Sequence, residues 1–392
     1  LQPTRLHQKR QVFQTFLRSE KSHPTQTQIP EDCARTIQAL VGSVTSEVGR
    51  ALIGISVMQL CIKAICPEQS IRLHKGGAAG GENFSWVQGI SMRTLDKAYI
   101  TPALRQYGLL KLNADGFMMT RSLAENYPYT ALYKAAIRGG KREWLQIVED
   151  LETGKLDGLL GLKYLISLLI NRSDQFEVLA EQCLTSTSRW VAAAKDVTDY
   201  FNLVDDFVQT SEYSARIFEI ALHSAYQALD ELRYISGTLK PISQMRSANK
   251  KHGNVGDIEI LQSLTGMLIE EAIDAKFGKV NLREELEELS EKLAYHPECS
   301  IAGFVCDRQP VRTNEILGRA AEIAEMHGCK ITIESFHEWF YRILETVKGD
   351  EVKFCRRWVM ALAESLCQKR REAAPIDEPC ESWLKTLSAI TR

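Results

Sequence analysis

The chain has 392 residues, of which 44% are hydrophobic and 25% are charged, enough for two or three domains with substantial cores that need no disulfides. Its 48 Lys and Arg residues nearly balance 50 Asp and Glu residues, so a nucleic-acid-binding surface would require charges sorted onto different faces. Ten scattered cysteines without a CxxC pair exclude a zinc site of the usual spacing and a secreted disulfide scaffold. No apolar run reaches ~18 residues and residues 1–22 are too polar for a signal peptide, so we expect a cytoplasmic protein without a membrane partner.

The first 140 residues are predicted to be a mainly helical DNA-binding region. Residues 91–106 form a helix in which Pro102 favours a kink or a break. A Gly stop and two short apolar runs follow, separated by the turn-prone residues 113–116, which is typical of a β-hairpin. This order resembles a winged helix-turn-helix module, covering about residues 47–121.

The resemblance implies DNA contacts from basic side chains on the helix and on the hairpin. The candidates are Arg93, Lys97, Arg105 and Lys111. The alternative is a small helical subdomain with a hairpin that binds no nucleic acid. Residues 141–205 then form a helical connector, whose apolar patch at 159–170 belongs either to the core or to a subunit interface.

Residues 214–233 form an amphipathic helix that carries Glu219 in its first turns. The segment 233–256 after it has five Lys or Arg residues and no acidic residue. Its basic and amide side chains are candidates to contact DNA phosphates or base edges. They are Lys240, Gln244, Arg246, Asn249, Lys250 and Lys251. The alternative is a solvated loop without a ligand.

Two carboxylates and a lysine follow, with the spacing that a metal-dependent nuclease needs. Asp274 and Lys276 lie two residues apart in a predicted strand, so they project from the same face. If the strand that begins near Asp257 pairs with it, Asp257 reaches that face too. A metal held by two carboxylates can polarise a phosphodiester and activate water, while a lysine stabilises charge or orients the water. Glu259, on the same strand face as Asp257, is a second-choice ligand.

Downstream, helices and strands alternate. A helix is predicted over 281–295 with Asn281 as its cap, and a strand over 300–306. Next come a helix over 313–327, stopped by Gly328, and a strand over 329–333. Helices over 334–348 and 351–372 and a last short helix complete the chain.

The motif and this order of elements together resemble the PD-(D/E)xK nuclease superfamily, which includes the type II restriction endonucleases. Gly256-Asp257 stands where the motif has Pro-Asp, and Asp274-Ala275-Lys276 where it more often has Glu-x-Lys. The resemblance implies an α/β nuclease core, a mixed sheet flanked by helices, over residues 206–345, followed by C-terminal helices over 346–392. The resemblance to this superfamily covers about residues 214–333.

The resemblance further implies a site-specific, Mg2+-dependent double-stranded DNA endonuclease. Asp257 and Asp274 would be the metal ligands, Lys276 would position the attacking water, and Glu219 would assist from the helix. A homodimer and a cognate DNA methyltransferase in the same system are expected partners. The rival hypotheses are a non-catalytic winged-helix DNA-binding regulator, and a defence or repair nuclease without a fixed recognition sequence.

Overall fold

The computed structural model describes ten segments of the chain: residues 16–20, 28–43, 47–73, 90–110, 116, 121–137, 139–242, 254–262, 268–369 and 379–392. The chain forms two compact units. Unit 1 comprises Leu1–Val178 with Ala374–Glu378, and unit 2 comprises Leu179–Ala373 with Pro379–Arg392. The boundary falls within the long helix α8 (Gly158–Ala193), so the predicted connector over residues 141–205 contributes to both units.

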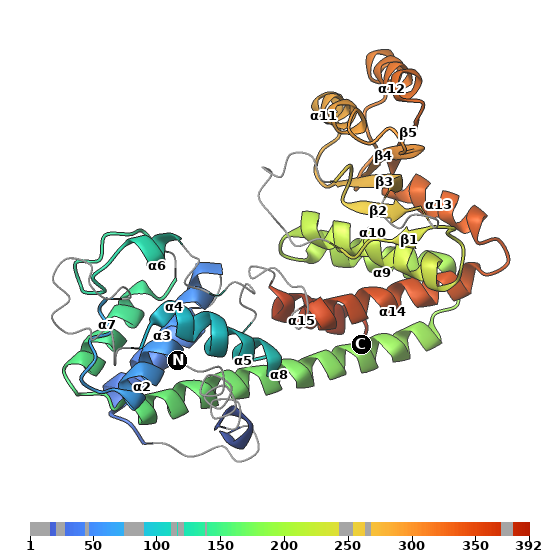
Figure 1. Cartoon of the computed structure of the whole chain (residues 1–392). Coiled ribbons are helices and arrows are strands. Elements are labelled where there is room, and N and C mark those ends of the chain that lie inside the picture. The colour runs from blue at the N-terminus through green and yellow to red at the C-terminus, as the bar shows by residue number, and fades with distance from the viewer. Residues whose placement is uncertain are drawn as a thin grey trace. The chain divides into compact units, whose positions relative to one another are not determined.

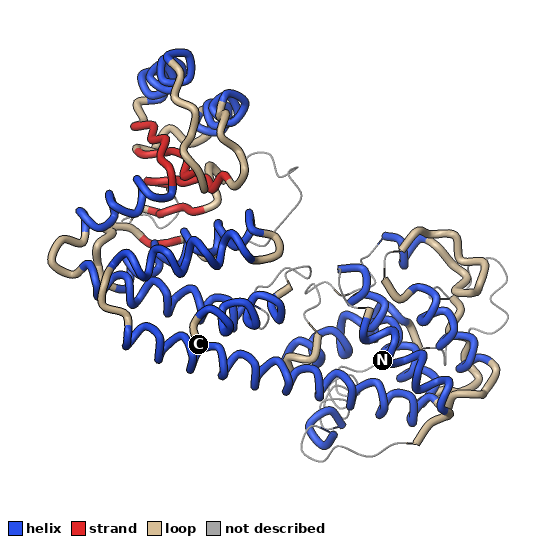
Figure 2. The backbone as a smooth tube through the Cα atoms, turned by 180° about the vertical axis from the view of Figure 1, so that it is seen from behind, coloured by secondary structure: helices blue, strands red, loops and turns tan. Residues whose placement is uncertain are grey.

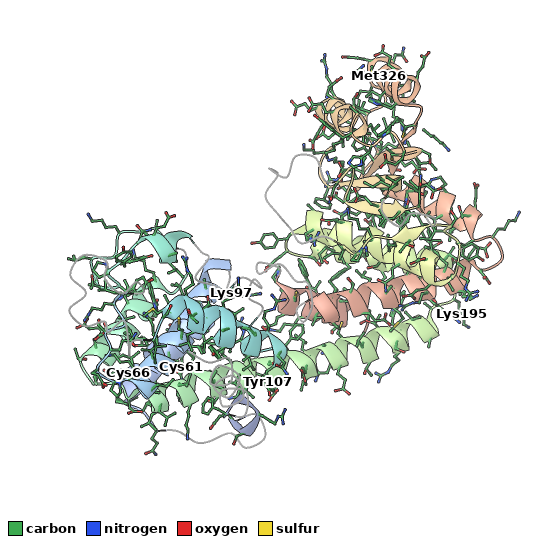
Figure 3. All side chains as sticks on the ribbon, viewed as in Figure 1. Cys61, Cys66, Lys97, Tyr107, Lys195 and Met326 are labelled. Atoms are coloured by element: carbon green, nitrogen blue, oxygen red, sulfur yellow. The ribbon has the colours of Figure 1, made fainter. Side chains whose placement is uncertain are left out.

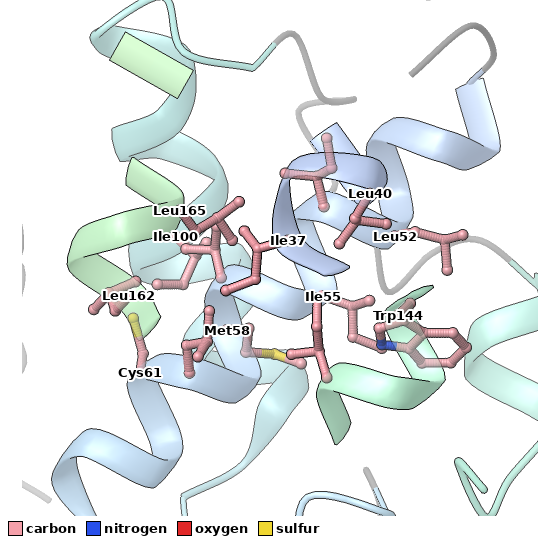
Figure 4. Close-up of a cluster of buried hydrophobic side chains, with 14 of the residues drawn as sticks. Ile37, Leu40, Leu52, Ile55, Met58, Cys61, Ile100, Trp144, Leu162 and Leu165 are labelled. Atoms are coloured by element: carbon pink, nitrogen blue, oxygen red, sulfur yellow. The ribbon is translucent and has the colours of Figure 1, made fainter. Parts of the chain in front are cut away.

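The described part of unit 1 is helical (Figures 1 and 2). Its core is formed by α2 (Glu31–Gly42), α3 (Glu47–Ile65), α7 (Lys141–Glu152) and the first part of α8. Figure 4 shows side chains from these helices interdigitating around α3. Since α3 is buried on all sides between residues 51 and 62, it needs no polar face. The indole N–H of the buried Trp144 donates to Gln59 Oε1 over 2.9 Å, which satisfies both polar groups in the core.

The helix predicted over residues 91–106 is present as three consecutive pieces. They are α4 (Met92–Leu95), the π-helical turn η1 (Asp96–Ile100) and α5 (Thr101–Gln106). The π-helical turn η1 ends two residues before Pro102, whose ring would clash with an upstream carbonyl oxygen in a regular α-helix. The short helix α6 (Arg121–Glu125) begins directly after the residues of the predicted hairpin. Residues 111–115 and 117–120 of the predicted hairpin, Lys111 included, lie outside the described residues.

Unit 2 contains a mixed five-stranded sheet in the order β1-β2-β3-β4-β5. The strands are β1 (Thr238–Leu239), β2 (Ile258–Leu261), β3 (Ile269–Lys276), β4 (Ile301–Cys306) and β5 (Lys330–Ser335). The first three are antiparallel neighbours, whereas β3, β4 and β5 run parallel to one another. The strands predicted over 300–306 and 329–333 are therefore confirmed, as is the strand that carries Asp274.

Helices cover both faces of this sheet (Figure 1). On one face, the leucines of α11 (Arg283–Leu293) and the isoleucines of α12 (Asn314–His327) are buried against Ala272, Ala302 and Phe304. On the other face lie α10 (Ser214–Glu231) and α13 (Phe336–Thr346). The α/β architecture expected from the sequence is thus present in unit 2.

Three more helices pack behind α10. They are α9 (Val197–Thr210), α14 (Glu351–Lys369) and α15 (Cys380–Ile390). The buried Trp358 indole N–H of α14 donates to the Ala221 carbonyl oxygen of α10 over 2.8 Å. Among the described residues, no helix has both the length and the apolar character that crossing a membrane requires.

Helix ends follow the sequence signals at α12 but not at α11. Thr313 caps α12 by accepting from the Ile316 backbone N–H, and Gly328 ends it with a positive φ of 62°. The prediction that Asn281 caps the next helix upstream was wrong by one residue, because Leu282 occupies the N-cap position of α11. Asn281 still accepts a hydrogen bond from the Arg283 backbone N–H over 3.2 Å.

Candidate active site

Strands β2 and β3 bring Asp257 and Asp274 together. Ile258 pairs with Ile273 in the antiparallel ladder, so the register continued by one residue sets Asp257 opposite Asp274. The Ala275 backbone N–H donates to Asp257 Oδ2 over 3.0 Å and fixes that carboxyl group against β3. The two carboxyl groups therefore lie on neighbouring strands at the same level of the ladder. The predicted strand pairing is confirmed, and it joins the two acidic side chains.

Gly256 lets the chain approach β3 closely just before Asp257. A Cβ atom at this position would lie 2.7 Å from the Ile273 carbonyl oxygen and 2.9 Å from its carbonyl carbon. These are backbone atoms of a central strand, so they cannot move aside without disturbing the ladder. Glycine is therefore the residue that allows Asp257 to face Asp274.

Replacing Gly256 by alanine is expected to destabilise the fold by about 1–3 kcal/mol, because the added methyl group overpacks against β3. The matched control is Gly318→Ala in α12, where no atom lies within 4 Å of the added Cβ. That substitution should stabilise the protein by roughly 0.5–1 kcal/mol, since alanine is the better helix former. Urea unfolding of both variants measures the difference; equal stabilities would contradict the close approach at Gly256.

The acidic pair has an asymmetric protonation. Burial and the neighbouring Asp274 charge raise the pKa of Asp257 well above its ordinary range. Burial acts in the same direction on Asp274, but the hydrogen bond from Asp257 and the charge of Lys276 outweigh it and lower the Asp274 pKa. The opposite directions of the two pKa shifts make Asp257 the group of the pair that binds a proton more readily.

Lys276 lies beside this pair on the same face of β3. Its Nζ is 2.8 Å from Asp274 Oδ2, and the two side chains are only 17% and 16% exposed. Burial tends to lower the pKa of Lys276, but the charge of Asp274 outweighs it and raises that pKa, so the lysine is charged. The ammonium group also lies 5.7 Å from the centre of the Phe304 ring. The predicted common direction of Asp274 and Lys276 is thus confirmed.

Glu219 comes from α10 and lies near enough to Asp257 to raise its pKa further. Its side chain is 14% exposed and forms an ion pair with Arg216, three residues earlier on the same helix. Arg216 was not among the site residues predicted from the sequence. The opposite charges at i and i+3 on a predicted helix were the available signal for this pair.

Glu259 stabilises the turn before β2. The side chain is buried, accepts from the Val255 backbone N–H over 2.6 Å and forms an ion pair with Lys240. Lys240 also donates to Asn254 Oδ1 over 3.2 Å. The structure therefore ties both the second-choice ligand and one predicted DNA contact to the segment that leads into Asp257.

The other predicted DNA contacts fall into two groups. Arg93, Lys97 and Arg105 are exposed on the α4-η1-α5 run of unit 1, where Figure 3 labels Lys97. The remaining ones lie outside the described residues: Gln244, Arg246, Asn249, Lys250 and Lys251. All three cations are accessible to solvent, as a contact with a phosphate backbone would require.

The donor set suits a hard divalent cation. In the described part of the chain, no group of three or more His, Cys, Asp or Glu side chains is placed to hold a metal ion. Mg2+ is commonly bound by only one or two carboxylates and completes its shell with water and substrate phosphate oxygens. Asp257 and Asp274 supply such a pair of carboxylates next to Lys276.

No protein-family model matches the chain, and no curated protein matches it either.

Proposed function

We propose that the protein is a Mg2+-dependent endonuclease that hydrolyses phosphodiester bonds of double-stranded DNA at specific sites, as a type II restriction enzyme does. The observation that carries the proposal is the group formed by Asp257, Asp274 and Lys276. Two carboxylates lie beside a charged lysine, at a partly exposed end of a central strand. Few other reactions require this combination of an oxygen-ligand pair and a fixed cation.

The fold of unit 2 supports the same proposal. A helix with Glu219 precedes three antiparallel strands, which are followed by a helix and a parallel strand. The same order of elements occurs in the core of the PD-(D/E)xK superfamily, and the acidic pair and lysine stand on the second and third strands. We further propose a homodimer, so that both strands are cut, and a cognate DNA methyltransferase that protects the host.

Each residue has a distinct part in the proposed reaction. Asp257 and Asp274 would hold the cation, which when bound polarises a phosphoryl oxygen and lowers the pKa of a water molecule. Lys276, held 2.8 Å from Asp274, keeps a positive charge beside the ligands and donates hydrogen bonds to the attacking water or to the developing phosphoryl charge. The Ala275 N–H and Gly256 hold Asp257 in register throughout.

The experiment that tests this function is digestion of unmethylated phage DNA with and without Mg2+. The intact protein is compared with Asp274→Ala and Lys276→Ala. Discrete fragments that require Mg2+ and are lost in both variants support the proposal. Smeared products would indicate a nuclease without a fixed site, and DNA binding without cleavage would indicate a regulator.

We propose that the exposed cations of the α4-η1-α5 run contact DNA phosphates. The double variant Arg93→Ala/Lys97→Ala should bind duplex DNA more weakly on every sequence. The slope of log K against log salt should fall by about 2, one unit for each lost phosphate contact. Fluorescence anisotropy at several salt concentrations measures both effects. Arg142→Ala, which removes another exposed cation of unit 1, is the control; an equal loss in the control would refute a specific role for this helix.

A further inference from the structure

Glu219 and the acidic pair belong to opposite sides of the sheet. Helix α10 packs on the face of β3 that carries Glu271, whose Oε1 accepts from the Tyr226 hydroxyl over 3.1 Å. The rings of Phe218 and Phe277 meet on this face as well, with centroids 6.4 Å apart. Asp274 alternates to the other face, where its parallel-strand partner is Phe304. Glu219 therefore approaches Asp257 from the α10 side of the sheet, opposite to the face that carries Asp274.

Arg216 holds Glu219 on that side. Arg216 is only 4% exposed, and its guanidinium forms an ion pair with Glu219 one helical turn away. Giving up such a pair is costly when the charge is buried. A metal ion bound to Glu219 would also lie next to the guanidinium, and the two positive charges would repel each other in a partly desolvated site.

The five charged groups described at the acidic pair balance with a single cation. Glu219 and Arg216 sum to zero, which leaves −1 for Asp257, Asp274 and Lys276 when both carboxylates are ionised. One divalent cation and one phosphodiester charge add +1 and neutralise the site. A second divalent cation would leave an excess of +2 in a site whose side chains are less than one-fifth exposed.

We propose that Arg216 withdraws Glu219 from metal binding, so that the centre takes one divalent cation, held by Asp257 and Asp274. Arg216 is then a positioning residue that sets the number of metal ions. The inference rests on the proposed function, since it assumes a metal at this pair. The sequence expectation left Glu219 to assist through metal or water, and this proposal removes the route through metal.

Titration of the full chain with Mn2+, followed by calorimetry and electron paramagnetic resonance, tests this without any measurement of activity. The wild type should bind one Mn2+ per chain. Glu219→Gln should leave the affinity within about threefold, whereas Asp274→Asn should lower it at least about tenfold, or ~1.4 kcal/mol. Arg216→Lys keeps the charge and should match the wild type. Arg216→Gln frees Glu219 and should increase the affinity or add a second ion.

Two results would overturn the inference alone. One is a Glu219→Gln variant that loses Mn2+ as completely as Asp274→Asn, and the other is a wild type that binds two ions and loses one with Glu219. A wild type that binds no Mn2+, or an Asp274→Asn variant that binds it unchanged, would instead refute the proposed function. Circular dichroism checks folding, and if Arg216→Gln does not fold, Glu219→Gln and Arg216→Lys still decide the question.

Discussion

Replacing Lys276 by methionine should lower the rate of Mg2+-dependent DNA cleavage by about 100- to 1,000-fold, the usual cost of removing one fixed donor from a charged transition state. Methionine keeps an unbranched stem beside the Phe304 ring but removes the ammonium group 2.8 Å from Asp274. The loss should therefore appear in the chemical step. Single-turnover cleavage at saturating protein measures this step directly.

Two controls separate charge from structure at this position. Lys276→Arg retains a positive charge and should keep more activity than Lys276→Met, although the larger guanidinium fits a different geometry. Glu270→Gln changes a side chain four residues before Asp274, on the same strand and the same face. This variant should cleave DNA at the wild-type rate. If Lys276→Met cleaves within threefold of the wild type, the lysine has no part in the reaction.

Asp257→Asn should abolish metal-dependent cleavage and yet stabilise the metal-free fold at neutral pH. The folded-state pKa of Asp257 is raised above its unfolded value, so the folded chain binds the extra proton between these two pKa values. Stability is therefore lost as pH rises through that window. Asparagine reproduces the protonated acid, because its amide can donate to Asp274 while its oxygen accepts from the Ala275 N–H. The free energy of unfolding should rise by on the order of 1 kcal/mol, because residues kept for function often reduce the stability of the fold.

The sign of this effect can be checked by thermal melting in a chelator between pH 4 and pH 8. The advantage of Asp257→Asn over the wild type should be present at pH 8 and shrink toward pH 4, as protonation of the wild-type carboxyl in the folded state restores the stability of the wild type. Asp274→Asn is the contrasting variant. The pKa of Asp274 is lowered, so its stabilising charge is present at neutral pH and the asparagine variant should melt lower there. Equal melting temperatures for Asp257→Asn and wild type at pH 8 would contradict the raised pKa.

The pairing of the acidic residues could be predicted from the sequence because it follows from alternation and from one strand contact. Asp274 and Lys276 share a face for any regular strand, and the ladder at Ile258 and Ile273 then brings in Asp257. Helix α12 was equally accessible, since Thr313 and Gly328 are local signals that act within their own turns. The acidic pair and the ends of α12 therefore depend on one strand contact and on residues close in the sequence.

Other features depend on tertiary contacts that no single-chain pattern contains. Strand alternation places Glu259 on the same face as Asp257, so the sequence pattern does not distinguish their roles. The contacts with Lys240 and with the Val255 N–H show that Glu259 holds the local structure. The side of the sheet from which Glu219 approaches depends on how α10 packs, whereas its ion pair with Arg216 is local to the helix. The π-helical turn before Pro102 replaced a simple kink because the helix could continue by widening.

The burial of the thiols makes this chain convenient for chemical labelling. Nine of the ten cysteines are buried, and only Cys66, at the end of α3, is partly exposed. Burial raises the pKa of the Cys306 and Cys355 thiols to about 12, so they hold almost no thiolate at neutral pH. A maleimide dye should therefore attach first at Cys66, in unit 1, without any cysteine being mutated. A fluorophore placed there would test the proposed contact of unit 1 with DNA while leaving the acidic centre in unit 2 chemically untouched.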